Sequence, residues 1–178
     1  FRYAIQNVGG EKTAQATLEI TVTQGANKNP VVEELADSYS AVEDTPYSFS
    51  CIVRDRDVAL PAQDNLGLTI TSTNQTILKD ENITIDSRPV EGDEDAVKYI
   101  VGLTFEDNAN TEEVVRYGEG LSLEITAQDD QQGAVTTTVP VVVTAQNDAP
   151  VLSLSTDSIA IEEDGWTTIT ATVTDVDM

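Results

Sequence analysis

Residues 141–154 read VVVTAQNDAPVLSL, and this stretch joins the end of one predicted domain to the start of the next. Val141 and Val143 occupy every second position, the spacing of a half-buried β-strand. The NDAP sequence at 147–150 ends that strand, because proline has no N–H to donate and its ring holds Ala149 extended. The pattern therefore predicts a last strand, a five-residue linker and the first residues of the next domain, with the rest of the chain arranged as repeats on joints of this kind.

An internal repeat supports this interpretation. Residues 42–57 (VEDTPYSFSCIVRDRD) match residues 162–177 (EEDGWTTITATVTDVD) without a gap, at an offset of 120 residues. The Glu-Asp pair, the apolar positions and the closing Asp-x-Asp coincide, and Pro30-Val31 matches Pro150-Val151 at the same offset. We therefore expect three units: the C-terminal strands of a preceding repeat (1–28), a complete repeat (29–148) and the N-terminal strands of a following repeat (149–178).

The complete repeat has the pattern of an all-β fold. Seven short strands are predicted near 37–42, 46–54, 66–72, 82–86, 97–105, 119–127 and 134–144, without a convincing helical period. Seven strands in about 120 residues are typical of a Greek-key β-sandwich. In the second strand we expect Tyr47, Phe49, Cys51 and Val53 to face the core and Ser48, Ser50 and Arg54 to face outward.

Charge and composition exclude several classes of function. The chain has 32 acidic and 9 basic residues, a formal charge of −23, which disfavours binding to nucleic acid or anionic lipid. It has no histidine and one cysteine, so catalysis through histidine, most zinc sites and an intrachain disulfide are ruled out. No nucleophile–base pair or phosphate loop is present, and we expect no enzymatic activity. No segment is apolar enough to span a membrane, and the strand-like ends of the chain suggest a window cut from a longer polypeptide.

Five short motifs together carry a family resemblance. They are EDTP at 43–46, DRD at 55–57, LTITSTN at 68–74, AQDD at 127–130 with Gly133, and NDAP at 147–150. With these motifs the chain resembles the bacterial cadherin-like/Ig-like tandem repeats of large surface adhesins and secreted repeat proteins. The resemblance implies tandem Ig-like/cadherin-like Greek-key β-sandwiches joined by short linkers, an extracellular cell-surface location, and Ca²⁺ at the joints.

The second joint offers many oxygen ligands for such an ion, since Ca²⁺ takes six to eight oxygens from carboxylates, carbonyls and waters. The resemblance implies that three groups of side chains converge there: Asp129 and Asp130 in a turn; Asn147 and Asp148 in the linker; and Glu162, Glu163, Asp164, Asp175 and Asp177 in the next repeat. Asp175 and Asp177 flank one residue, so their side chains point the same way from an extended segment. The alternative is that these residues lie at strand ends because they favour turns.

The first joint serves as an internal comparison. Glu43, Asp44, Asp55 and Asp57 are predicted on its upper side. Lys28, however, stands where the second joint has Asp148, and Asn7-Val8 replaces Asp129-Asp130. We therefore expect a weaker or partial calcium site there.

The leading functional hypothesis is a structural spacer or adhesive tandem-repeat segment of a bacterial extracellular surface protein or filament. Its partners would be the neighbouring repeats of the same chain, and a variant adds other copies through lateral contacts or strand donation. The alternative is a ligand-binding module for carbohydrate or protein. Its aromatic candidates, Tyr39, Tyr99, Tyr117 and Trp166, are scattered over separate predicted strands, which argues against a single sugar platform.

Overall fold

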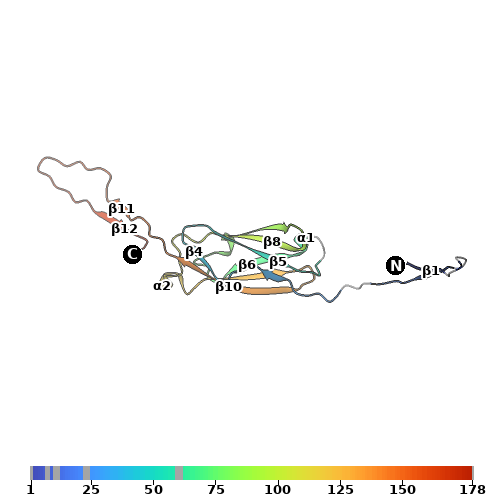
Figure 1. Ribbon diagram of the computed structural model, residues 1–178. Helices are drawn as coiled ribbons and strands as arrows, with labels where there is room; N and C mark the ends of the chain where they lie inside the picture. The colour runs from blue at the N-terminus through green and yellow to red at the C-terminus, as the bar shows by residue number, and fades with distance from the viewer. Residues whose placement is uncertain (1, 7–8, 10–12, 22–24, 59–61, 178) are drawn as a thin grey trace.

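A computed structural model describes residues 2–6, 9, 13–21, 25–58 and 62–177. Two four-stranded sheets form a central sandwich, and a two-stranded hairpin lies beyond each end of it (Figure 1). The first sheet contains β3 (Val31–Glu33), β5 (Tyr47–Arg54), β8 (Asp93–Leu103) and β7 (Ile83–Val90), in that order. The second contains β4 (Tyr39–Val42), β10 (Ala134–Thr144), β9 (Ser122–Gln128) and β6 (Gly67–Ser72).

The topology is that of an Ig-like Greek-key sandwich. Within the two sheets all strand pairs are antiparallel except β4 with β10, which run parallel over Val141–Thr144. The chain enters along β3 in one sheet and crosses to the other sheet as β4, so both sheets are held by the same short segment. The short elements α1 (Ala62–Asn65), η1 (Asp80–Asn82) and α2 (Val114–Tyr117) lie in the connections.

The core lies between the inner faces of the two sheets. Strand β9 shows the alternation clearly: Leu123, Ile125 and Ala127 are fully buried, whereas Glu124 and Gln128 are exposed. Cys51 is also fully buried and burial raises the pKa of its thiol to about 11, so it acts as a small apolar side chain. The hydroxyl of Tyr117 donates to the backbone carbonyl of Asn108, closing the long connection between β8 and β9.

The all-β fold predicted from the sequence is confirmed. The seven predicted strands correspond to β4 through β10, and the alternation of Phe49, Cys51 and Val53 with Ser48 agrees with the burial along β5. Strand β3 was not predicted, because it has three residues directly after Pro30 and resembles the linker. The hairpins β1 (Arg2–Gln6) with β2 (Thr13–Thr17) and β11 (Val151–Leu154) with β12 (Ala171–Thr174) fall in the predicted flanking units, whose tandem arrangement stays a prediction. In the described residues no helix has the length and hydropathy to cross a membrane.

Asn74 should be a major source of stability at one end of the sandwich. Its amide nitrogen donates to Tyr117 O and Gly120 O, both at 2.9 Å, and its amide oxygen accepts from the N–H of Thr76. Asn74→Ala leaves these groups unpaired, and we expect a loss of about 2 kcal/mol, or roughly 8 °C in Tm. Thermal unfolding of the purified chain measures this.

Asn74→Asp tests whether the stabilisation comes from the hydrogen bonds of the amide or from the packing of a side chain of this size. The aspartate keeps the size of the side chain but loses both donors and places a negative charge against two carbonyl oxygens. A Tm equal to that of the unaltered chain would contradict the role of the amide.

Candidate calcium sites at the two ends of the sandwich

The acidic side chains gather at opposite ends of the sandwich. Strand β10 alone has 11 residues, which corresponds to about 35 Å from end to end. The N-terminal joint is defined here as Asn27, Lys28, Asp55, Asp57 and Asp129. The C-terminal joint is defined as Glu43, Asp44, Asp148, Asp175 and Asp177.

At the N-terminal joint, Asp129 holds the linker against the turn between β9 and β10. It is 5% exposed, its Oδ1 accepts from the N–H groups of Gln131 and Gly133 at 2.8 Å, and its Oδ2 accepts from Asn27 Nδ2 at 3.0 Å. A Cβ at Gly133 would lie 2.3 Å from Asp129 Oδ2 and 2.8 Å from Asn27 Nδ2. Only glycine therefore allows the linker and the turn to approach so closely.

Asp55 and Asp57 form the second half of this joint. The backbone N–H of Lys28 donates to Asp57 Oδ2 at 2.8 Å, and the N–H of Asp57 donates to Asp55 Oδ1 at 3.1 Å. Asp55 is 4% exposed, and its Oδ2 is buried without a hydrogen-bond partner. Burial raises the pKa of Asp55 to about 6, helped by the carboxylates of Asp57 and Asp129. The pKa of Asp57 is lowered, chiefly by a hydrogen bond between its side chain and that of Asp55, and further by Lys28.

The C-terminal joint has the same pair of hydrogen bonds at the offset of 120 residues. The N–H of Asp148 donates to Asp177 Oδ2 at 2.5 Å, and the N–H of Asp177 donates to Asp175 Oδ1 at 3.0 Å. These two bonds are the counterparts of those made by Lys28 and Asp57 at the other joint. The two copies of the sequence repeat therefore share this pair of hydrogen bonds as well as their residues.

Glu43 ties the sandwich to the linker at this end. It is 1% exposed, and its Oε1 accepts from the N–H of Gln146 at 2.8 Å while its Oε2 accepts from Asn110 Nδ2 at 2.9 Å. Arg116 in α2 adds a contact across the joint, because its Nη1 donates to Val176 O at 3.2 Å. The start of the linker and the 175–177 loop are thus both bonded to the end of the sandwich.

Asp148 lies at the centre of the C-terminal joint. Its Oδ2 is shielded from solvent and has no hydrogen-bond partner. Desolvation raises the pKa of this carboxyl, and four neighbouring carboxylates add to the effect: Asp44, Asp177, Glu43 and Asp175. Such surroundings disfavour the ionised form of the carboxyl, and a nearby positive charge would stabilise it.

The predicted grouping of the ligands was wrong in three places. Asp129 and Asp130 lie at the N-terminal end, because the turn between β9 and β10 lies at the far end of β10 from Thr144 and the linker. Glu43 and Asp44 lie at the C-terminal end, since the N–H of Glu43 donates to Thr144 O.

The third error concerns Glu162, Glu163 and Asp164. They lie in the loop between β11 and β12, which extends away from the sandwich and from the 175–177 loop (Figure 1). Asp164 has φ 65° and its counterpart Asp44 has φ 57°, so the two copies of the sequence repeat form the same kind of turn. Asn147 does lie in the linker, where its Nδ2 donates to Asp148 O. Residues 7–8 lie outside the described part of the chain.

Sequence reasoning missed several residues that shape these joints. Asn27 binds Asp129, and its counterpart at the 120-residue offset is Asn147, so the repeat itself contained the signal. The sequence repeat does not identify the partners of Glu43, which are Asn110 and Gln146. Asn110 comes from a long connection and Gln146 from the linker.

The donors suit a hard cation in kind, since they are oxygens and include two buried oxygens without partners, Asp55 Oδ2 and Asp148 Oδ2. Within the described residues, no group of three or more acidic, histidine or cysteine side chains converges into a complete metal site. The joints therefore contain oxygen atoms of the kind that Ca²⁺ binds, but these atoms are not gathered into one coordination shell.

The aromatic residues considered for ligand binding do not form a platform. Tyr39 and Tyr99 are core residues, with 8% and 5% exposure, and Tyr117 is half-buried. Trp166, at 86% exposure, lies in the loop between β11 and β12.

Comparisons with known proteins give distant structural neighbours and no sequence match. No protein-family model and no curated protein sequence matches the chain. Among solved structures, the BIgI domain of the beta protein from S. agalactiae, bound to CEACAM1, is 11% identical with a TM-score of 0.41, over 66% of this chain and 97% of that one. A point mutant of the SrpA adhesin from Streptococcus sanguinis is also 11% identical, with a TM-score of 0.47, over 68% of this chain and 61% of that one. Likeness at this level carries no argument about function.

Asp55 predicts a pH dependence of stability in the metal-free protein. Its pKa is about 6 in the folded chain against 3.8 for an unperturbed carboxyl. A raised carboxyl pKa means that the folded state is favoured while Asp55 is protonated, and this advantage is lost as the pH rises from about 4 through 6. In chelator, Asp55→Asn should raise the free energy of unfolding at pH 7.5 by up to about 3 kcal/mol.

The same substitution should have little effect at pH 4, where the carboxyl is protonated in the folded state. Denaturant unfolding at both pH values measures the difference. A stabilisation that is equal at pH 4 and pH 7.5 would show that the charge of Asp55 is not the cause.

Proposed function

We propose that this chain is a spacer segment of an extracellular surface protein or filament, and that Ca²⁺ at its joints fixes successive β-sandwiches in line. The observation that carries the proposal is the Asp148 carboxylate, whose Oδ2 is buried without a hydrogen-bond partner and whose pKa is raised by desolvation and by four other carboxylates. Those carboxylates come from the end of the sandwich (Glu43, Asp44) and from the next unit (Asp175, Asp177). A cation among them would bind both units at once.

Electrostatics favour an ion at this position. Five carboxylates near one another repel, and the guanidinium of Arg116 at this joint donates to the carbonyl of Val176. The unpartnered Asp148 Oδ2, the Asn147 side chain and linker carbonyls are ligands that Ca²⁺ accepts. When bound, the ion would supply positive charge and fix the distance between the units.

The size of the effect suits a spacer. With a typical extracellular affinity of roughly 10⁻⁴–10⁻³ M, and Ca²⁺ at ten to a hundred times that value, one site adds about 1.4–2.7 kcal/mol to the bound arrangement. That is enough to hold a short linker in one geometry without making the joint permanent.

The N-terminal joint should respond less to calcium. Lys28 replaces the central carboxylate of Asp148, and its charge already lowers the pKa of Asp57. The lysine thus supplies part of the positive charge that the other joint lacks. We propose that the two joints differ in their calcium requirement for this reason.

Calcium titration tests the spacer function. The chain is measured in millimolar Ca²⁺ and in chelator by thermal unfolding and by small-angle X-ray scattering. We expect Ca²⁺ to raise the Tm by several degrees and to narrow the distribution of end-to-end distances. Asp148→Asn combined with Asp175→Asn should abolish both effects.

Asp86→Asn is the control, since Asp86 is an exposed carboxylate on β7 and belongs to neither joint. It should leave the calcium response intact. An unaltered chain whose Tm and scattering are the same in Ca²⁺ and in chelator would overturn the proposal.

Lys28→Asp tests the difference between the joints. The substitution gives the N-terminal joint the central carboxylate of the C-terminal joint. Isothermal titration should then show additional calcium binding, and the Tm in chelator should fall because of added repulsion. An unchanged binding stoichiometry would contradict the role given to Lys28.

A further inference from the structure

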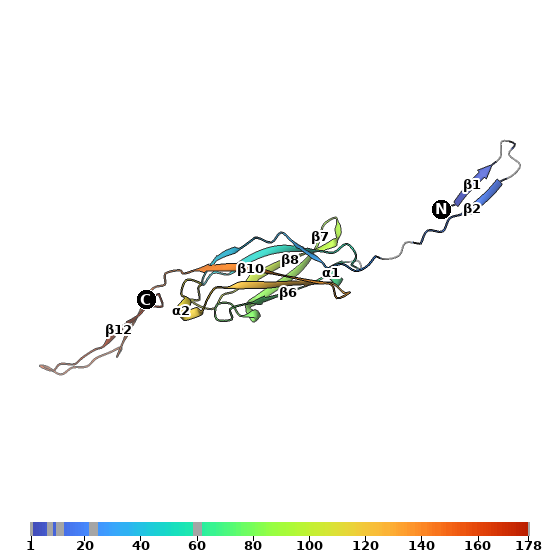
Figure 2. The same ribbon diagram turned by 90° about the horizontal axis from the view of Figure 1, so that it is seen from below.

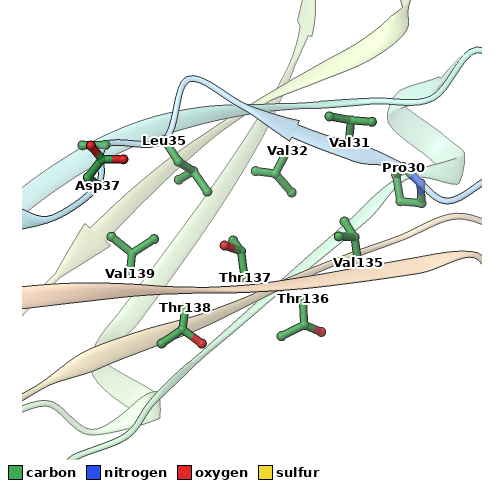
Figure 3. A pocket seen from close by; sticks show the side chains of 11 residues that line it. Pro30, Val31, Val32, Leu35, Asp37, Val135, Thr136, Thr137, Thr138 and Val139 are labelled. Carbon is green, nitrogen blue, oxygen red and sulfur yellow. The ribbon is translucent and has the colours of Figure 1, made fainter.

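A groove opens along the seam between the two sheets on the side of β3 and β10. It has a volume of about 490 Å³ and is lined by residues 30–32, 35–37 and 135–139. Val32 and Leu35 on one wall face Val135, Thr137 and Val139 on β10, whereas Thr136 and Thr138 point to the opposite face of the sheet (Figure 3). The groove is therefore apolar inside and bounded by a β-strand.

Strand β10 runs along the sandwich (Figure 2), and none of the described strands pairs with its edge beside this groove. Strand β9 pairs with β10 from Ala134 to Pro140 on the other side, whereas β4 pairs with it only from Val141 to Thr144. The N–H of Val141 donates toward the β9 side, to Leu121 O, and the direction alternates along a strand. The N–H groups of Thr136 and Thr138 consequently point away from β9, toward the open edge.

The other exposed edges of the sandwich carry more protection against strand pairing than this one, where Pro140 closes one end of the free stretch. Strand β7 has Asp86, Arg88 and Pro89, with an irregular register at its end. On β6 the N–H of Ser72 is bonded to Asp80 Oδ1, and β3 and β4 have only three and four residues. The free part of β10 reads AVTTTV before Pro140, without a charge. Charges, prolines, bulges and short length are the usual means of blocking an edge.

We propose that this edge binds an extended basic segment of another protein as an added β-strand. About six residues, or 20 Å, match the free length of β10. Every second side chain would enter the groove between Leu35 and Val139, which suits valine-sized groups. Among the described residues that line the groove, Asp37 is the charged one. The neighbouring Glu34 is exposed, and the chain carries a net charge of −23. Charge complementarity therefore selects a basic partner and disfavours a second copy of this chain.

A capped hexapeptide of alternating lysine and valine is the probe. Fluorescence anisotropy with the full chain should show saturable binding that weakens as salt is added. The corresponding glutamate–valine peptide should bind at least about tenfold more weakly. A lysine–valine peptide with prolines at alternate positions should also bind weakly, because it cannot donate to a strand edge.

Two substitutions on β10 locate the site. Thr136→Pro removes an N–H that points to the open edge, at a position equivalent to that of Pro140 in the same strand, and should weaken binding roughly two- to tenfold. Thr136→Lys places a charge on the edge and should also weaken binding. Thr71→Lys is its control, an exposed threonine on β6 in the same sheet. Circular dichroism and Tm confirm that each variant is folded.

Amide hydrogen exchange gives a direct readout. Bound peptide should slow exchange at Thr136 and Thr138, while Thr137 and Val139, which face β9, should be protected with or without peptide. Equal binding of the proline-containing peptide, equal binding by Thr136→Pro, or no slowing at Thr136 and Thr138 would each overturn the proposal. Self-association of the chain that Thr136→Pro abolishes would also overturn it, by making a second copy the occupant.

Discussion

The crossing of the chain from β3 to β4 determines the arrangement of everything else in this molecule. In residues 31–42 the backbone leaves the β5 edge of one sheet and pairs with the β10 edge of the other. This crossing closes one half of the seam between the sheets and leaves the other half open as the groove beside β10. It also places the incoming linker at one end of the sandwich and the turn with Glu43 and Asp44 at the other, so each end receives its own acidic set.

The same residues serve the fold and the proposed ion sites. Asp129 is needed to close the turn before β10, because it accepts two backbone N–H groups, and it also binds Asn27 of the linker. Glu43 likewise satisfies the N–H of Gln146 and the amide of Asn110. These carboxylates are buried because hydrogen bonds compensate their desolvation. Asp55 and Asp148 differ, because each keeps one buried oxygen without a partner. The calcium proposal rests on these two oxygens.

Much of the fold was predictable from the sequence, whereas the assembly of the sites was not. Alternation along the strands depends on local residues only, so β4 through β10 could be placed within a few residues. The end of the sandwich at which a turn lies depends on strand pairing, and spacing along the chain does not reveal it. Asp129 and Asp148 are close in sequence but are separated by the length of β10, whereas Glu43 and Asp148 are distant in sequence and share one joint. The 120-residue repeat could have shown this, since aligning Asp44 with Asp164 and Asp57 with Asp177 already assigns them to different ends.

Charge connects the two proposals while geometry keeps them separate. A net charge of −23 would favour both Ca²⁺ at the joints and a basic strand in the groove, and added salt would weaken both interactions. The joints, however, use side-chain oxygens at the ends of the strands, whereas the groove uses backbone N–H and C=O groups along one strand. Calcium at the joints would leave the Thr136 and Thr138 edge untouched, because the described ligands lie beyond both ends of its free segment. A chain of such units could therefore set its length with calcium and present a row of binding edges at regular intervals, with neither property requiring the other.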